Sequence, residues 1–231
     1  MALSRRDFVK LCSGTVAGFG VSQMFHPAIH EAFAQTLTGE RPPVFWVQGQ
    51  GCTGCSVTLL NSTHPSIADV LLKIISLEFH PTVMAAEGEG AYEHMMRVAE
   101  KFKGKFIFAV EGAVPVAHDG KCCVVAEADH HEVTMTEVTK VLAANAAAVL
   151  AVGTCAAYGG IPAGKGNETG AMGVSAFLKK EGIPAPVINI PGCPPHPDWI
   201  VGTIGLGLQA LATNTLGLLV KQGLDANGRP K

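Results

Sequence analysis

Short apolar runs recur along the chain and alternate with longer segments in which apolar residues follow the period of a helix. The runs contain few polar residues, which is typical of strands that are buried on both faces. They predict five strands, at Val44–Val47, Ile74–Glu78, Phe106–Val110, Val149–Val152 and Val187–Ile190. The periodic segments predict helices near Val57–Leu72, Ala91–Phe102, Thr136–Ala144, Val174–Lys180 and Pro197–Leu211.

Regular alternation of strand and helix is typical of a parallel sheet that is covered by helices on both faces. We therefore expect an α/β fold, a flavodoxin-like doubly wound parallel sheet, formed by residues 35–231. One hairpin interrupts the alternation, from Cys122–Ala126 and Glu132–Met135, with its turn near the "DHH" sequence.

Residues 1–34 have the features of an export signal. Arg5 and Arg6 precede an apolar stretch, and Ala32 and Ala34 supply a small-x-small cleavage pattern. The "SRRDFVK" sequence indicates the twin-arginine route. The apolar stretch is shorter than the about 20 residues that span a bilayer. We expect a periplasmic protein that is exported already folded, with any membrane association made through partners.

Composition narrows the function further. The formal net charge is −2 and there is no basic block, which argues against nucleic-acid binding. Hydrophobic residues make up 48% of the chain and charged residues 16%, so we expect much of the surface to be buried against a partner. The cysteines number seven, an odd count, and their spacing does not suggest a disulfide scaffold. A bound metal explains them better.

Four cysteines follow predicted strands. Cys52 and Cys55, in "GCTGCS", come after the first strand, Cys155 after the fourth and Cys193 after the fifth. Loops at the carboxyl ends of parallel strands converge on one edge of the sheet. We therefore expect these four thiols to meet at that edge.

Four thiolates can hold either a zinc ion or an iron–sulfur cluster. Structural zinc usually takes two CxxC-like pairs, whereas Cys155 and Cys193 come singly and lie in glycine- and proline-rich loops. The residues favour a cluster, and they leave open a zinc ion or a redox dithiol of Cys52 and Cys55. The adjacent Cys122 and Cys123 would point to opposite faces of a strand, so we expect structural thiols there.

The segments "GCTGCS", "ISLEFHPTVMA", "AVEGAVP", "VGTCAAYGGIP" and "PGCPPHPDW" occur in this order. Together they resemble the small, electron-transferring subunit of nickel–iron hydrogenases. Val57 stands where many members have glutamate, and this valine is similar to the nickel–iron–selenium branch.

The resemblance implies that Cys52, Cys55, Cys155 and Cys193 bind one 4Fe–4S cluster, the proximal cluster of that family. It implies a subunit of an oxidoreductase that has no catalytic residue of its own. The hydrogen-converting nickel–iron site would lie on a partner large subunit, and electrons would pass to an acceptor such as a cytochrome. The resemblance also places Glu111 of "AVEGAVP" beside the cluster, where it could accept hydrogen bonds or relay protons; a purely loop-ordering role is the alternative.

Members of the family usually continue past a "GRP" sequence like that at Gly228–Pro230 into a cysteine-rich region with medial and distal clusters. This sequence stops at Lys231, so we expect no ligands for a 3Fe–4S or a further 4Fe–4S cluster in it. Either the chain is truncated, or it works with one cluster and passes electrons to another polypeptide. Two alternatives remain: a binding module stabilised by zinc on four cysteines, and the one-cluster subunit of a related energy-converting complex, against which the twin-arginine leader argues.

Overall fold

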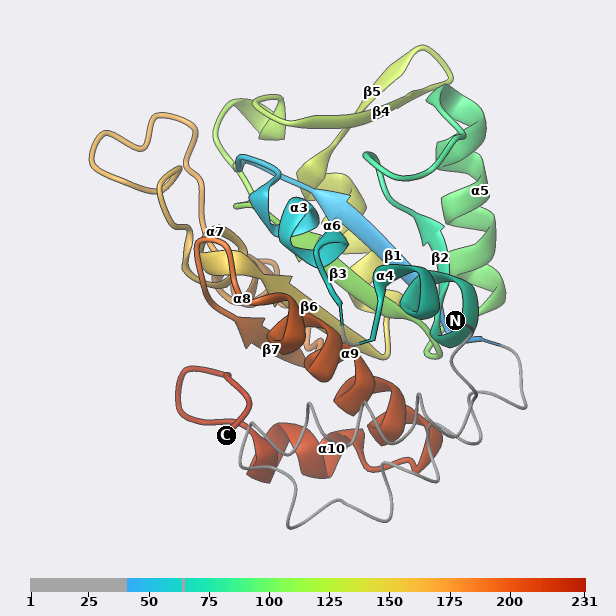
Figure 1. The fold of residues 1–231 in the computed structure, drawn as a ribbon. Coiled ribbons are helices and arrows are strands. Elements are labelled where there is room, and N and C mark those ends of the chain that lie inside the picture. Colours follow the sequence, from blue (N-terminus) through green and yellow to red (C-terminus); the bar gives the residue numbers. More distant parts are fainter. Residues whose placement is uncertain (1–40, 64) are drawn as a thin grey trace.

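The computed structural model describes residues 41–63 and 65–231 (Figure 1). The predicted signal at residues 1–34 lies outside the described residues. In the described part, five parallel strands form one sheet in the order β2-β1-β3-β6-β7. The strands are β1 Pro43–Gln48, β2 Ser76–Phe79, β3 Ile107–Glu111, β6 Ala148–Val152 and β7 Val187–Ile190. Numbered along the chain, they follow the order 2-1-3-4-5 of flavodoxin-like sheets, which confirms the expected fold class.

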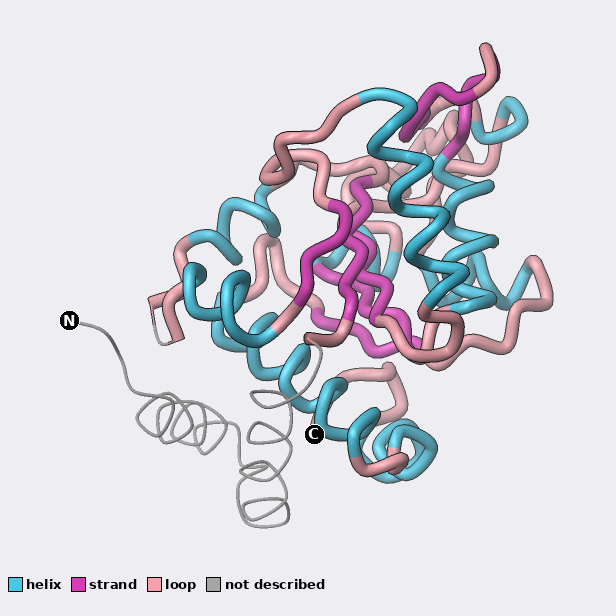
Figure 2. The backbone as a smooth tube through the Cα atoms, turned by 90° about the vertical axis from the view of Figure 1, so that its right-hand side faces the viewer, coloured by secondary structure: helices cyan, strands magenta, loops and turns pink. Residues whose placement is uncertain are grey.

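Helices cover both faces of this sheet, so the strands lie between two helical layers (Figure 2). One layer contains α3 Gly54–Leu60, α4 Ile67–Asp69 with the π-helical turn η1 Val70–Ile74, and α9 Pro197–Ala212, followed by α10 Leu216–Leu218 and η3 Leu219–Gly223. The other contains α5 Gly88–Lys101, α6 Met135–Asn145, α7 Gly153–Tyr158 and α8 Val174–Lys180. None of the described helices has the length and apolar character needed to cross a membrane.

Successive residues of each strand pack into opposite cores. In β1, Trp46 joins the core beneath α9, whereas Phe45 and Val47 join the core beneath α5 and α6. All three side chains are almost fully buried. A strand with helices on both sides therefore needs apolar residues at consecutive positions, which is the pattern that predicted it.

The predicted helix over Val57–Leu72 is wrong in extent. Helix α3 ends at Leu60, and helical structure resumes only at Ile67. Pro65 lies in the gap and has no N–H to donate within a helix. The hydroxyl of Ser62 donates to the Pro65 carbonyl at 2.7 Å and closes the intervening turn. Because η1 then extends to Ile74, the second strand starts later than predicted.

The predicted hairpin is confirmed as β4 Val124–Ala128 paired with β5 His131–Thr134. Asp129 and His130 form its two-residue turn with φ of 51° and 60°, the left-handed pair that such tight turns require. Directly after β5, a capping box between Thr134 and Glu137 starts α6. The N–H of Thr134 lowers the pKa of Glu137, so this stabilisation exists above the ordinary carboxyl pKa and is lost as the pH falls through the lowered value.

The capping box yields a stability prediction. We expect Thr134→Ala to lower the free energy of unfolding by about 1 kcal/mol, because the Glu137 N–H loses its acceptor at the helix start. Thr134→Ser keeps the hydroxyl and should retain most of that stability. Urea unfolding of the purified chain, followed by circular dichroism, measures both. Equal losses in the two variants would contradict a capping role.

Candidate iron–sulfur site

The four predicted cysteines lie at one edge of the sheet, beyond the carboxyl ends of β1, β6 and β7. Cys52 lies in the turn after β1, and Cys193 lies between β7 and α9. Cys55 and Cys155, however, lie within the first turns of α3 and α7 rather than in loops. The sequence therefore placed the residues at the right edge but missed the short helix α7.

Backbone geometry shapes the CxxC turn. Thr53 adopts a left-handed conformation with φ of 66°, and its side chain makes no capping bond to α3. The buried Glu111 carboxylate takes that place: its Oε1 accepts the backbone N–H of Cys55 at 2.9 Å and of Ser56 at 3.1 Å. Negative charge at a helix N-terminus is favourable. Glu111 therefore holds the backbone of a candidate ligand in place.

A second set of bonds joins the two single-cysteine segments. The Thr154 N–H donates to the Gly192 carbonyl at 2.9 Å, and the Gly192 N–H donates to Thr154 Oγ1 at 3.1 Å. The Thr154 hydroxyl also donates to the Gly192 carbonyl at 3.1 Å. Thr154 precedes Cys155 and Gly192 precedes Cys193, so this clamp fixes the two cysteines relative to each other.

Two glycines bring backbone against the sulfur atoms. A Cβ added to Gly153 would lie 2.5 Å from the Sγ of Cys55, and one added to Gly160 would lie 2.7 Å from the Sγ of Cys155. Both glycines have positive φ, at 88° and 55°. No larger residue fits at either position without displacing a sulfur or the backbone.

The sulfurs are close enough to interact electrostatically. Burial, Glu111 and then the three other cysteines raise the pKa of Cys55 to about 12. Burial raises the pKa of Cys155 as well; a backbone hydrogen bond from Ile161 opposes this, and Cys193, Cys52 and Glu111 add to it. Four ionised thiols here would repel one another unless a positively charged group lay between them. Across residues 41–63 and 65–231, no three His, Cys, Asp or Glu side chains are spaced for a single metal ion.

Glu111 is the centre of a buried polar network at the point where the strand order reverses between β1 and β3. Its side chain is 3% exposed. In addition to the two backbone bonds, its Oε2 accepts from Trp46 Nε1 at 3.0 Å and from the Ser56 hydroxyl, and Gln48 Nε2 lies 3.4 Å away. Four donors to one carboxylate satisfy a charge that would otherwise be costly to bury.

Sequence reasoning missed part of this network. It did not single out His80, which is 1% exposed and follows β2 at the same sheet edge. The ring stacks on Trp46 with centroids 5.4 Å apart, and its Nε2 lies 3.2 Å from Ser56 Oγ. The rule that located the cysteines, position after the carboxyl end of a strand, also applied to His80.

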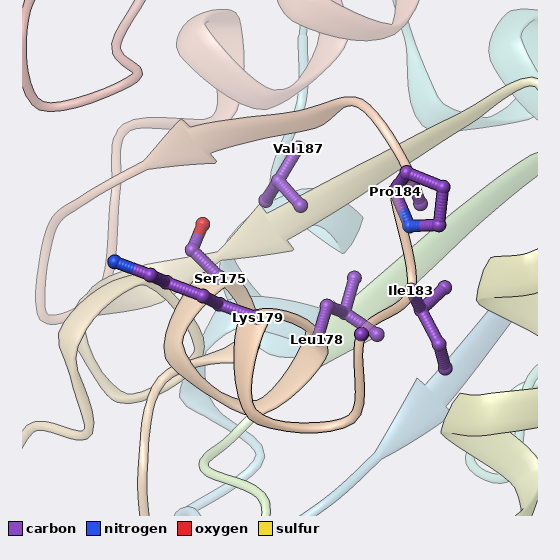
Figure 3. Close-up of a pocket in the computed structure, with 8 residues that line it drawn as sticks. Ser175, Leu178, Lys179, Ile183, Pro184 and Val187 are labelled. Atoms are coloured by element: carbon purple, nitrogen blue, oxygen red, sulfur yellow. The ribbon is translucent and has the colours of Figure 1, made fainter.

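Two other features contribute no side chain to this group. Cys122 and Cys123 precede β4, so they do not lie on a strand as expected. The Cys123 thiol lies 3.9 Å from the Gln48 carbonyl, and its pKa is raised by burial and by Cys122. An open apolar hollow of about 510 Å³ lies between α8 and β7, where Leu178, Ile183 and Val187 line it (Figure 3). Val187 begins β7, so the hollow lies at the opposite end of that strand from Cys193.

Comparison with known proteins places the chain among characterised relatives. Residues 52–206 match the family model described as NADH ubiquinone oxidoreductase, 20 Kd subunit. The chain is 54% identical over 235 residues to the periplasmic [NiFeSe] hydrogenase small subunit of Desulfomicrobium baculatum, covering all of this chain and 73% of that protein. It is 38% identical over 202 residues to the Hydrogenase-2 small chain of Escherichia coli K12, covering 87% of this chain and 51% of that one.

A solved structure agrees with these similarities. The recombinant [NiFeSe] hydrogenase of Desulfovibrio vulgaris Hildenborough matches with a TM-score of 0.81 and 70% identity, over 84% of this chain and 70% of that one. The chain thus spans about half to three quarters of the length of these relatives. The family model, the identities and the shared fold agree, and the chain belongs to the NADH ubiquinone oxidoreductase 20 Kd subunit family and, more closely, to the hydrogenase small subunits.

Proposed function

We propose that this chain is the electron-transferring small subunit of a periplasmic nickel–iron hydrogenase, similar to the selenium-containing type. It holds one 4Fe–4S cluster and passes electrons between a large-subunit active site, where dihydrogen is reversibly converted to protons and electrons, and an acceptor such as a cytochrome. The main support is the convergence of Cys52, Cys55, Cys155 and Cys193 at one sheet edge, where the other three cysteines help to raise the pKa of Cys55.

The residues present fit such a cluster. Four thiolates are the usual ligand set of a 4Fe–4S cluster, and the positive charge of its iron would offset their mutual repulsion. Gly153 and Gly160 leave room for backbone directly against two of the sulfurs. When bound, the cluster would supply one-electron transfer. Besides these four, the described cysteines are only Cys122 and Cys123, too few for the ligand set of a second cluster.

Each neighbouring group has a defined task in this proposal. Glu111 holds the Cys55 backbone, and the Thr154–Gly192 clamp holds Cys155 and Cys193. The two cores under α3 and α7 keep water from the inner side of the site. None of these residues makes or breaks a bond to hydrogen, so the hydrogen chemistry belongs to the partner.

Large apolar side chains are exposed on the helices that contain or follow the cysteine segments. Val57 of α3, Tyr158 of α7, Ile161 just after it and Trp199 of α9 are 55%, 48%, 82% and 47% exposed. Exposed apolar groups gathered around a site are typical of a protein–protein interface. We assign them to contact with the large subunit.

Location follows from the sequence and the relatives together. The Desulfomicrobium relative is named periplasmic, and residues 1–34 of this chain have the pattern of a twin-arginine signal. We propose export by that route, with residues 35–231 as the mature domain.

Replacing Cys155, which has no second cysteine in its segment, tests the ligand set. We expect Cys155→Ser, co-expressed anaerobically with a candidate large subunit, to lose most of its iron and visible absorption and at least tenfold of its hydrogen uptake. Cys123→Ser is the matched control, because Cys123 lies outside the four, and it should retain the cluster. Metal analysis and absorption spectra measure both. An unchanged spectrum in Cys155→Ser, or zinc in place of iron in the unaltered protein, would refute the proposal.

Two glycine-to-alanine variants test the close packing of the backbone against a cysteine sulfur. Gly153→Ala introduces a Cβ only 2.5 Å from the Cys55 Sγ, which must move, so iron content should fall sharply. Gly182→Ala is the control: Gly182 also has positive φ, at 69°, but nothing lies within 4 Å of an added Cβ. The control should cost only about 1–2 kcal/mol of folding free energy and keep its iron. Equal iron contents in the two variants would show that the Gly153 contact is unimportant.

A further inference from the structure

A strip of buried polar side chains lies beneath the CxxC turn. It contains His80 after β2, Ser56 in α3, and Gln48 and Glu111 at the ends of β1 and β3. His80 and Ser56 are each 1% exposed. Buried polar groups are costly unless their hydrogen bonds are complete, so the position of each proton in this strip can be worked out.

The histidine fixes the first proton. The backbone N–H of Thr82 donates to His80 Nδ1 at 3.2 Å, so that nitrogen must be unprotonated. Burial lowers the pKa of His80 despite the opposing charge of Glu111, which keeps the ring neutral near pH 7. A neutral ring with an acceptor at Nδ1 carries its hydrogen on Nε2. That N–H faces Ser56 Oγ at 3.2 Å.

The serine hydroxyl is then left with one orientation. Its oxygen accepts from His80 Nε2 and also from Gln48 Nε2 at 2.9 Å. The two hydrogens of the Gln48 amide go to its two acceptors at 2.9 Å, Ser56 Oγ and Thr82 Oγ1, rather than to Glu111 Oε2 at 3.4 Å. Both lone pairs are in use, so the single hydroxyl hydrogen can point only to a third partner. That partner is Glu111 Oε2.

From this proton order we propose that His80 is a positioning residue of the site. By donating to Ser56 it directs the serine hydroxyl to Glu111, and so fixes the carboxylate that binds the Cys55 N–H. The inference rests on the proposed cluster, whose potential depends on the hydrogen bonds and charges around it. His80 thereby helps to set that potential without contacting a sulfur ligand.

Removing the histidine nitrogens has a definite expected effect. In His80→Phe the ring can still stack on Trp46, but Ser56 Oγ regains a free lone pair and its hydroxyl is no longer forced toward Glu111. The Glu111 carboxylate then has one hydrogen-bond donor fewer, and its less compensated negative charge stabilises the oxidised cluster relative to the reduced one. We expect the midpoint potential to become more negative, and Ser56→Ala to shift it in the same direction.

The test is an EPR-monitored redox titration of the cluster in the assembled heterodimer, for the unaltered protein, the two single variants and the double variant. Because His80 acts through Ser56, the double variant should shift no further than Ser56→Ala alone. His80→Gln supplies an amide that can accept from Thr82 and donate to Ser56, and it should restore the original potential. If His80→Phe does not assemble, His80→Asn replaces it, since asparagine is too short to reach Ser56.

The outcomes separate this inference from the proposed function. An unchanged potential in His80→Phe (or in His80→Asn, if that variant replaces it), additive shifts in the double variant, or a failure of His80→Gln to restore the potential would overturn the role of His80 while leaving the cluster assignment intact. Unaltered protein that contains no iron–sulfur cluster would instead overturn the proposed function, before any variant is compared.

Discussion

The mutual repulsion of closely placed anionic groups is the constraint on which the rest of this structure depends. Burial, Glu111 and three other cysteines raise the pKa of Cys55 to about 12, so its thiolate forms near pH 7 only beside a compensating positive charge. A buried carboxylate beside four thiols is unfavourable for folding unless each charge has compensating donors or a bound cation. The fold supplies four hydrogen bonds to Glu111, and a positively charged metal group would relieve the thiolates.

This constraint explains why so many hydrogen bonds join the segments at this edge of the sheet. Glu111 ties β3 to the start of α3, and the Thr154–Gly192 clamp ties α7 to the segment after β7. Because Gly153 has no side chain, the backbone at the start of α7 packs directly against the Cys55 sulfur of α3. Rigid ligands suit electron transfer, because a site that changes little between redox states needs little reorganisation.

The sequence could predict the strands and the edge where the cysteines meet, because both follow from short-range rules. Consecutive apolar residues such as Phe45, Trp46 and Val47 indicate a strand covered on both faces, and parallel strands share a carboxyl edge. The first and last residues of the helices were harder to predict. Pro65 divides the predicted first helix, and the six-residue α7 lies between Val152 and Gly159, too short for a periodic signal. The resemblance singled out Glu111 as an acceptor of hydrogen bonds, but its partners could not be predicted. They depend on the register that sets Gln48 opposite Glu111 and on the path that returns His80 to Trp46.

X-ray absorption at the iron and zinc edges of the anaerobically purified heterodimer tests the central claim most directly. The account predicts iron surrounded by sulfur, with a nearby second iron in the scattering, as in a cubane cluster held by four cysteines. Zinc bound by four sulfurs at about 2.3 Å, with no iron–iron scattering at the iron edge, would contradict it.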